Sequence, residues 1–444
     1  MKFARPLVVL CAIVAIAGSA VRAAEDDNWP ALGGSLGTSV SAEVGLPTTW
    51  SATENVAWKA PIPGRGHSSP IIWGDRIFLT TAIKGDPVEG HEAIAHEFNG
   101  EPFLHPDSVD ASFTHQYRVV AIDARGGDVL WDRLASERAP LDNRHRMSSF
   151  ASPTAVTDGE RVYAYFGTPG LFAYDFDGNL LWSAEVGAIP TLGMGVGSSP
   201  ILAGELVIIQ ADEDWGDHSA LIAFDRRTGE ERWRTARPVS VTWATPILIE
   251  GERDELVTIA NEWIISYAPG TGEELWRMEG LASNAIHRPL VFRDLVIATA
   301  GYPQKAVKAI RLGGSGDLTG TDHLAWEYGK GTGYVPSNLA SGDYVYLLND
   351  QGILTCLDAA TGAIVYEGGR MPIQQRFSAS PVAYDGKILM PGVDGDLFVI
   401  RAGPEFEVLA TNSLDEAIWA TPAVAGGRIY IRTVNHLWAI GGGG

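Results

Sequence analysis

The chain has 444 residues, of which 45% are hydrophobic, 51 are glycine and 25 are proline. This composition excludes a disordered or fibrous chain and is typical of a globular protein rich in turns. The formal net charge of -21 excludes nucleic acid and anionic membrane surfaces as general partners, because both would be repelled.

The first residues have the pattern of an export signal. Lys2 and Arg5 precede the apolar run Leu7–Ala17, and the sequence VRA fits cleavage after Ala23. The run is shorter than the ~20 residues that a spanning helix needs, so we expect no membrane span. We therefore predict a signal peptide over residues 1–23 and an exported protein, periplasmic or secreted. Its removal leaves 30 basic residues against 54 acidic ones and a charge of about −24.

The two cysteines, Cys11 and Cys356, provide no disulfide framework. Cys11 lies inside the predicted signal peptide, without the small residues before it that lipid attachment requires. Cys356 lies in GILTCLDAATG, which is apolar on most sides, so we expect a buried and unreactive thiol. Stability must therefore come from the packed core.

One phrase recurs along the chain: a small residue and Pro, a few apolar residues, a turn, and an apolar strand. It reads HSSPIIWGDRIFLTTA in its first copy and FASPTAVTDGERVYAYFG in its second. The small-Pro steps are Ser69-Pro70, Ser152-Pro153, Ser199-Pro200, Thr245-Pro246, Ser380-Pro381 and Thr421-Pro422, with variants at Arg288-Pro289 and Ser337-Asn338. These eight copies predict a repeat architecture.

A second phrase alternates with the first. AIDARGGDVLW, AYDFDGNLLW, AFDRRTGEERW, SYAPGTGEELW and CLDAATGAIVY each contain a strand, a turn built on Asp or Gly, and a second strand that ends in an aromatic residue. Each repeat of roughly 40 to 45 residues thus holds four short strands. This pattern predicts an all-β, eight-bladed β-propeller with four-stranded blades. We expect the terminal aromatics to pack between blades.

The last repeat stops before its aromatic strand. TPAVAGGRIYIRTVNHLWAI contains only the inner strands, whereas ENVAWKAPI, with Trp58, precedes the first small-Pro step. We predict that this N-terminal strand completes the eighth blade and closes the ring, because closure removes exposed sheet edges. Residues 24–444 then form one domain, and we expect a monomer.

The first repeat is longer than the others because it carries an insertion over residues 84–115. The insertion contains His91, His96, His105 and His115. His91 and His96 are five residues apart, which separates them by ~140° on a helix, whereas the zinc motif H-E-x-x-H needs a spacing of four. A loop could gather a metal from these histidines and the nearby carboxylates Glu89, Glu92, Glu97 and Asp107. We expect instead a solvated surface loop that the fold does not need, and no metal site.

Basic and aromatic residues gather in the segments before the small-Pro steps, which should line one mouth of the central channel. Acidic residues in these segments are only Asp415 and Glu416. A basic cleft favours an anion, and aromatic walls are typical of small-molecule sites. The alternative is that the cations pair with acids on neighbouring loops and fill the channel. The predicted ligand- or partner-binding residues are Arg65, His67, Arg144, His145, Arg146, Trp243, His287, Arg288, Tyr334, Arg376, Phe377 and Trp419.

The phrase A-x-D-x-x-T-G-x-x-x-W, clearest at Ala223–Trp233, resembles the tryptophan-docking repeat of quinoprotein dehydrogenases. With NWPALGG, AIRLGGSGDLTGT and AGPEFEVLATNSL, almost the whole mature chain resembles exported bacterial PQQ-like β-propeller repeat proteins, and it is similar to the BamB-like scaffold proteins. The resemblance implies a propeller and export. For quinoprotein dehydrogenases it also implies pyrroloquinoline quinone (PQQ) bound with calcium.

The sequence lacks the cysteine pair of quinoprotein dehydrogenases, and no cluster of acidic and amide residues in it can be assigned to calcium. Those enzymes have a vicinal cysteine pair beside the quinone and Glu, Asn and Asp around the calcium ion, whereas no two cysteines are adjacent here. DFDGN, at Asp175–Asn179, is far shorter than a calcium loop and is the turn of a repeat. We therefore expect no cofactor and a non-catalytic binding or scaffold protein whose partner is a protein segment or an anionic small molecule. The alternative is a PQQ-dependent oxidoreductase.

Overall fold

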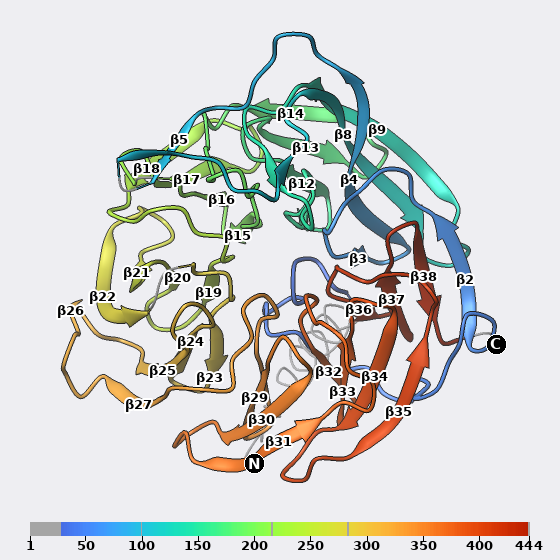
Figure 1. Ribbon diagram of the computed structural model, residues 1–444, viewed down its shortest axis with the longest axis vertical. Coiled ribbons are helices and arrows are strands. Elements are labelled where there is room, and N and C mark those ends of the chain that lie inside the picture. The colour runs from blue at the N-terminus through green and yellow to red at the C-terminus, as the bar shows by residue number, and fades with distance from the viewer. Residues whose placement is uncertain (1–27, 99, 215, 282–283, 443–444) are drawn as a thin grey trace, which may run out of the picture.

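The computed structural model describes residues 28–442 except Asn99, Trp215, Ala282 and Ser283. Its strands form eight blades around a central channel, each with four antiparallel strands, and two blades carry a short fifth strand that pairs in parallel. The predicted eight-bladed propeller is therefore confirmed (Figure 1). The predicted signal peptide, residues 1–23, lies outside the described residues. The described part of the chain contains no helix with the length and apolar character needed to span a membrane.

The blades follow one another in chain order. Blade one contains β3 (Ile71–Trp73), β4 (Arg76–Pro87), β8 (Phe113–Asp123) and β9 (Val129–Arg138). Blade two contains β11 (Val156–Thr157), β12 (Arg161–Tyr165), β13 (Leu171–Asp175) and β14 (Leu180–Ala184). Blade three contains β15 (Ile201–Ala203), β16 (Leu206–Ala211), β17 (Ala220–Asp225) and β18 (Glu231–Ala236). Blade four contains β19 (Ile247–Ile249), β20 (Glu255–Ile259), β21 (Glu262–Tyr267) and β22 (Glu274–Leu281), with the short β26 (Gly316–Asp317) beside β22.

The second half of the ring repeats this order. Blade five contains β23 (Leu290–Phe292), β24 (Leu295–Ala300), β25 (Ala306–Arg311) and β27 (Leu324–Tyr328). Blade six contains β28 (Leu339–Ser341), β29 (Tyr344–Leu348), β30 (Ile353–Asp358) and β31 (Ile364–Arg370). Blade seven contains β32 (Val382–Tyr384), β33 (Lys387–Pro391), β34 (Asp396–Arg401) and β35 (Val408–Ser413). Blade eight contains β36 (Ala423–Ala425), β37 (Arg428–Arg432), β38 (His436–Ile440) and β2 (Val56–Pro61).

The first strand of each blade lies at the channel. Contacts such as β3 with β11, β11 with β15 and β32 with β36 join these strands around the ring, and β36 contacts β3. The N-terminal β2 pairs with the C-terminal β38, with Trp58 opposite Ala439 and Ala60 opposite Leu437. The predicted closure of the ring by the N-terminal strand is therefore confirmed, and Figure 1 shows the blue β2 beside the red strands of blade eight.

Trp131, Trp182 and Trp233 pack on turn glycines of the next blade, so the predicted packing between blades is confirmed for them. Each is the third residue of its outer strand and not the last. Trp131 Nε1 donates a hydrogen bond to Phe176 O at 2.8 Å. The turn residue Gly178 has a φ of +80°, and a Cβ atom there would lie 2.7 Å from the Trp131 ring. Glycine is required at this turn because it alone adopts the conformation readily and leaves room for the ring.

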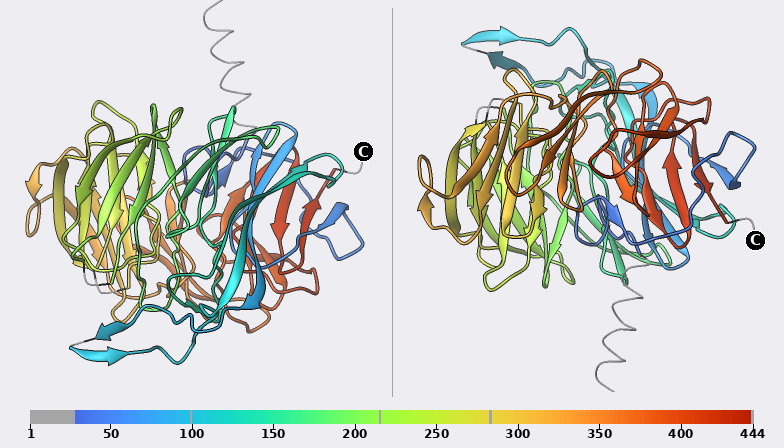
Figure 2. Two further views of the ribbon diagram at one scale, coloured as in Figure 1. Left: turned by 90° about the horizontal axis from the view of Figure 1, so that it is seen from above. Right: turned by 90° about the horizontal axis from the view of Figure 1, so that it is seen from below.

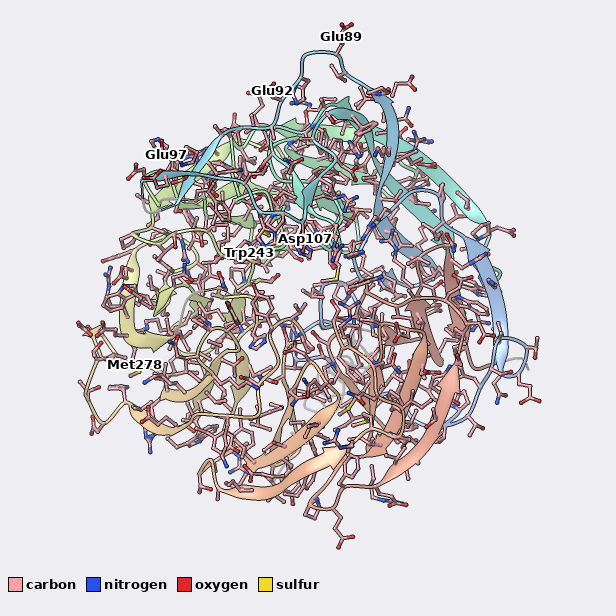
Figure 3. All side chains as sticks on the ribbon, in the orientation of Figure 1. Glu89, Glu92, Glu97, Asp107, Trp243 and Met278 are labelled. Atoms are coloured by element: carbon pink, nitrogen blue, oxygen red, sulfur yellow. The ribbon has the colours of Figure 1, made fainter. Side chains whose placement is uncertain are left out.

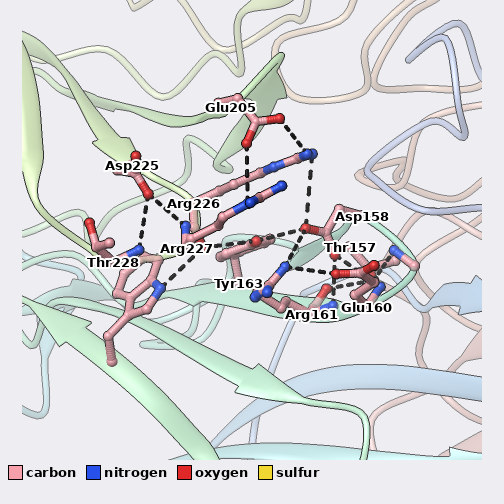
Figure 4. A network of polar contacts seen from close by, with 12 residues as sticks. Thr157, Asp158, Glu160, Arg161, Tyr163, Glu205, Asp225, Arg226, Arg227 and Thr228 are labelled. Carbon is pink, nitrogen blue, oxygen red and sulfur yellow. Dashed lines mark hydrogen bonds and ion pairs between the residues drawn. The ribbon is translucent and has the colours of Figure 1, made fainter.

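Polar contacts also join neighbouring blades, as Figure 4 shows for blades two and three. Tyr163 Oη donates to Asp158 Oδ2 at 2.8 Å and to Arg226 O at 3.1 Å. Arg226 Nη2 lies 2.7 Å from Glu205 Oε1 of its own blade, and Arg226 Nη1 lies 4.0 Å from Asp158 Oδ2 of blade two. Arg76 with Asp177 and Arg293 with Asp343 form further ion pairs between neighbouring blades.

Residues 28–41, which we call the N-terminal strap, lie across one end of the channel. Trp29 exchanges two backbone hydrogen bonds with Ile72 of blade one, at 2.9 and 2.8 Å. Thr157 N of blade two donates to Pro30 O at 2.9 Å. At its other end, β1 (Val40–Ser41) pairs in parallel with β32 of blade seven. The strap therefore joins the first strands of blades one, two and seven.

The insertion lies on the opposite face of the disc, where the segments before the first strands also lie (Figure 2). It contains the ribbon β5 (His96–Phe98) and β6 (Glu101–Phe103). Its β7 (Ser108–Val109) pairs with β10 (Arg144–His145), which precedes blade two. The predicted solvated surface loop is wrong, because His96 and His115 are buried and the segment is hydrogen-bonded to the body of the propeller.

Candidate functional site

Three of the twelve predicted residues meet at one cleft on the face that carries the insertion. Arg65, His67 and Trp419 line a cleft of about 400 Å³ together with Arg432, and we call it the basic cleft. The rings of His67 and Trp419 are stacked, with centroids 5.4 Å apart and planes 7° apart. Burial lowers the pKa of His67 well below its usual value, and the charges of Arg65, Arg432 and Arg144 add to this effect. His67 is therefore neutral at physiological pH and provides a flat aromatic wall.

Arg432 supplies the charge of the basic cleft. Its side chain is almost fully buried, at 2% exposure, at the end of β37. Nη1 donates to Ser68 Oγ at 2.6 Å and to Thr80 O at 2.9 Å. Burial lowers the pKa of Arg432 to about 9, and within the described part of the chain no carboxylate opposes this effect. The guanidinium is still protonated at neutral pH, so an uncompensated cation lies in the wall of the cleft.

A second compartment of about 220 Å³ adjoins the basic cleft through Arg65, which lines both. It contains Lys84, Asp110 and Arg144. Lys84 Nζ lies 2.8 Å from Asp110 Oδ1, and Arg144 forms an ion pair with the other oxygen of the same carboxylate. Burial would raise the pKa of Asp110, but the hydrogen bond from Lys84 and the charge of Arg144 outweigh it and lower the pKa. One carboxylate thus balances two cations, and the local charge stays positive.

His145 and Arg146 are occupied by an acid of the insertion. Arg146 Nε lies 3.0 Å from Asp107 Oδ1, and His145 Nε2 lies 3.5 Å from Asp107 Oδ2. For these two residues the structure supports the alternative in which the cations pair with acids on neighbouring loops. Figure 3 shows Asp107 beside the central opening, whereas Glu89, Glu92 and Glu97 lie at the outer part of the insertion.

Within the described residues, one group of three side chains brings potential metal-ligand atoms within 4.8 Å of one another: His105, Asp107 and His145. Its hydrogen bonds do not suit a metal. Nδ1 of His105 accepts the backbone N–H of Asp107, and Nδ1 of His145 accepts that of Met147, each at 3.2 Å. When Nδ1 of a neutral imidazole accepts a hydrogen bond, the proton of the ring is on Nε2. Nε2 is the nitrogen that would have to coordinate the metal ion. The group is better described as an anchor of the insertion.

His96 anchors the insertion to three other loops. Its Nε2 donates to Asp142 Oδ1 at 2.8 Å, and its Nδ1 donates to Asp214 of blade three. Asp142 Oδ2 also accepts the N–H of Thr191 at 2.8 Å. Burial would lower the pKa of His96, but the hydrogen bonds and charges of the two aspartates outweigh it and raise the pKa to about 9. A buried imidazolium between two carboxylates is the reason why the insertion is not a free loop.

Three predicted residues do not face this mouth. His287 is buried, with Nδ1 bonded to Thr299 Oγ1 at 2.7 Å. Phe377 is buried against Phe398, with ring centroids 6.0 Å apart. Arg288 extends to the other end of the channel, where it contacts the N-terminal strap. The predicted position at the mouth is wrong for these residues. Side chains alternate along the extended chain at a small-Pro step, so some point into the blade and others into the channel.

The remaining predicted residues surround the opening without forming one pocket. Arg376 is exposed, and its Nη1 lies 3.4 Å from Met147 Sδ, so loops of blades two and seven meet across the mouth. Trp243 Nε1 donates to Gly195 O at 2.8 Å, and Figure 3 shows Trp243 beside the opening. The Tyr334 ring packs on Tyr302, with centroids 5.2 Å apart.

Sequence reasoning missed Arg432, although the repeat contains a signal for it. Arg432 is the fifth residue of the second strand in blade eight, and the corresponding residues are Thr80, Tyr165 and Gln210 in blades one to three. An arginine among uncharged residues at an inward position is an exception that an alignment of the blades reveals. The acids Asp110, Asp142 and Asp214, of which the last two are buried, carry no such signal, because their partners come from other loops.

The described residues do not fit a calcium-bound quinone. Cys356 is a single buried thiol, and burial raises its pKa to about 12. The group of His105, Asp107 and His145 is rich in nitrogen, whereas calcium takes oxygen ligands. In DFDGN, Asp175 Oδ1 accepts the backbone N–H groups of Asp177 and Asn179 at 3.0 and 2.8 Å, so this carboxylate stabilises a turn, as predicted. No catalytic step through PQQ follows from these residues.

Comparison with known proteins places the fold in a family. Residues 115–368 match the family model described as outer membrane protein assembly factor BamB. The quinohemoprotein alcohol dehydrogenase ADH IIB of Pseudomonas putida is 24% identical over 242 residues, which cover 51% of this chain and 33% of that enzyme. The match thus spans only a third of the curated relative.

Solved structures show the same architecture. BamB from Moraxella catarrhalis has a TM-score of 0.53 and 14% identity, covering 79% of this chain and 99% of that chain. A europium-containing methanol dehydrogenase has a TM-score of 0.62 and 12% identity, covering 94% and 92%. The quinohemoprotein alcohol dehydrogenase of Comamonas testosteroni has a TM-score of 0.62 and 12% identity, covering 96% and 83%. At these identities the likeness concerns the fold.

Proposed function

The chain belongs to the family of the outer membrane protein assembly factor BamB, and from this premise we propose that it is an exported, non-catalytic binding protein whose ligand is held at the basic cleft. The pattern of residues 1–23 supports export to the periplasm or beyond. The ligand carries a carboxylate or another anion, as part of a protein segment or of a small molecule. We expect the protein to act as a monomer.

One observation carries the proposal: Arg432 is buried without a carboxylate partner in the wall of a cleft that Arg65 also lines. A buried cation is costly unless an anion compensates it. Arginine binds carboxylate or phosphate through two parallel hydrogen bonds, and the stacked His67–Trp419 pair gives an apolar surface beside it. An acidic side chain or a chain terminus of a partner protein has this chemistry.

Charge reversal at Arg65 is expected to weaken anion binding about 10–100-fold, because a charge-assisted hydrogen bond contributes about 1.5–3 kcal/mol. The probe is fluorescein-labelled hexaglutamate, and the measurement is fluorescence anisotropy. Arg65 is exposed, and its Nη2 donates only to Arg146 O, at 2.8 Å, so Arg65→Glu should melt like the wild type. Binding by the wild type should also weaken as sodium chloride screens the charges.

A matched control is Arg232→Glu, which makes the same charge change at an exposed residue of the outer strand β18. We expect this control to retain most of its affinity for hexaglutamate. Equal weakening in both variants, or binding that does not respond to salt, would mean that the basic cleft is not the anion site.

The oxidoreductase alternative is supported by the likeness to quinohemoprotein alcohol dehydrogenases. We expect the purified protein, mixed with PQQ and calcium and passed through a desalting column, to retain no quinone absorbance. We also expect no dye-linked oxidation of alcohols, because the sequence has no adjacent cysteines and the group His105, Asp107 and His145 is rich in nitrogen, whereas calcium takes oxygen ligands. Stoichiometric retention of PQQ together with alcohol oxidation would reverse this assignment.

A further inference from the structure

A second cleft lies at the other end of the channel, between the N-terminal strap and the first strands of the blades. It has a volume of about 420 Å³, within the range of about 300–1,000 Å³ typical of small-molecule sites. Residues Pro30–Thr38 of the strap form one wall. The opposite wall comes from blades two to five, and we call this space the strap cleft.

The walls of the strap cleft are mainly aliphatic. Leu32 and Leu36 contribute from the strap, and Ile201, Ile247 and Ile249 contribute from blades three and four. Leu36 is 72% exposed, so part of this apolar surface meets solvent. An apolar surface in a concave site favours a ligand with a hydrocarbon body.

One cation, Arg288, and one carboxylate, Glu250, line the strap cleft, and no ion pair joins them in the described part of the chain. It is 7% exposed, and its guanidinium donates to Leu32 O and to Ser39 Oγ of the strap, the latter at 3.1 Å. Both acceptors are uncharged, and Nε has no hydrogen-bond partner. Within the described part of the chain no carboxylate opposes the effect of burial, which lowers the pKa of Arg288 to about 10. The group remains protonated at neutral pH and its charge is uncompensated.

We propose that the strap cleft binds a small amphipathic carboxylate, whose carboxylate pairs with Arg288 and whose aliphatic body lies along Ile201, Ile247 and Ile249. A carboxylate would neutralise the buried charge, which neither strap oxygen does. The aliphatic walls would bury the hydrocarbon at roughly 25 cal/mol per Å². This site is separate from the basic cleft and does not depend on the function proposed for it.

The competing explanation is that Arg288 only holds the strap in place. A Cβ atom on Gly33 would lie 2.2 Å from Arg288 Nη2, so the strap and the guanidinium are closely fitted. If Arg288 only holds the strap, no anion needs to bind in the cleft. If Arg288 binds a ligand, the cleft should prefer carboxylates over neutral molecules of the same shape. The two explanations therefore differ in a measurable selectivity.

The experiment uses the mature protein, the fluorescent probe 11-(dansylamino)undecanoic acid, and decanoate and decanol as competitors. We expect decanoate to displace the probe at least 10-fold more effectively than decanol, since a charge-assisted hydrogen bond contributes about 1.5–3 kcal/mol. Arg288→Met should weaken decanoate about 10–100-fold and remove this preference. Equal displacement by decanoate and decanol, or no displacement by either, would overturn the inference.

Because Arg288→Met also removes contacts with the strap, a second variant keeps Arg288 and fills the cleft. Ile249 is half-buried on β19 and lines the cleft, so Ile249→Trp should lower decanoate affinity at least 10-fold. The control Ile364→Trp, at a half-exposed residue of the outer strand β31, should bind decanoate like the wild type. Unchanged affinity in Ile249→Trp would overturn the inference. A loss of decanoate binding in Arg65→Glu would also overturn it, by placing the ligand in the basic cleft.

Discussion

Deletion of Val44–Pro61 is expected to abolish the cooperative melting transition and to cause aggregation. The deletion removes β2, the outer strand of blade eight, and leaves the edge of β38 unpaired. It also removes Trp58, which is buried and whose Nε1 donates to Ala124 O of blade one at 2.9 Å. The ring would then be open between blades eight and one. Differential scanning calorimetry and light scattering after gel filtration measure both effects.

A circular permutant provides the control for this deletion. In it the chain begins at Pro63, and residues 24–62 follow Gly442 through a Gly-Ser linker. All strands are kept and only one connection changes, so we expect a cooperative transition within a few degrees of that of the wild type. If the simple deletion melted and remained monomeric like the wild type, ring closure by β2 would contribute nothing to stability.

Replacement of His96 by Gln is expected to lower the free energy of unfolding by about 3–5 kcal/mol, the usual effect of breaking a buried ion pair. The change leaves Asp142 and Asp214 buried without their cation. For the same reason, exchange of residues 84–115 for a Gly-Ser linker should destabilise the protein, contrary to the expectation from the sequence. Urea titration followed by tryptophan fluorescence measures the loss.

The same side chain makes stability depend on pH in a defined direction. The pKa of His96 is raised to about 9 in the folded protein, from about 6.5 in an unfolded chain. A raised pKa means that the folded state holds the proton more tightly, so the stabilisation is fully present below pH 6.5. It is lost as the pH rises through 9. The melting temperature of the wild type should therefore fall between pH 7 and 10, and that of His96→Gln should fall less.

His91→Gln is the control, because His91 belongs to the same insertion and its side chain makes one hydrogen bond, from Nε2 to Pro140 O at 2.9 Å. We expect this variant to keep nearly all the stability and the pH response of the wild type. A His96→Gln protein with unchanged urea midpoint and unchanged pH response would contradict a structural role for the imidazolium.

The fold could be predicted because the same two sequence phrases recur from blade to blade. The small-Pro step and the aromatic strand occur, with variants, in most blades, and an incomplete last repeat together with the spare strand around Trp58 predicts how the ring closes. Each phrase is a short segment of sequence, and its recurrence in several repeats strengthens the prediction. The position of the strap was not predicted, because residues 28–41 occur once and bind backbone atoms of several blades.

The site was predicted only in part, because the ion pairs around it join residues of different loops, and the sequence alone does not show which loops meet. Arg65 and Arg146 have similar surroundings in the sequence, yet Arg65 lines the basic cleft and Arg146 pairs with Asp107. His96 meets Asp142 and Asp214 from two other blades, which no spacing along the chain indicates. A count of basic residues near a mouth therefore overestimates the charge that is available to a ligand.

Closure of blade eight by strands from both ends of the chain also affects the order of folding. The ribosome makes β2 before any blade and β38 after all the others, so their pairing is among the longest-range contacts of the molecule. Contacts of this kind form slowly, because the chain between them loses entropy before it gains the contact. Blades one to seven can form before β2 pairs with β38, so we expect ring closure to be a late step of folding. Until then the chain is exposed to proteases and to pairing with other chains, which gives this protein a reason to depend on chaperones during its synthesis.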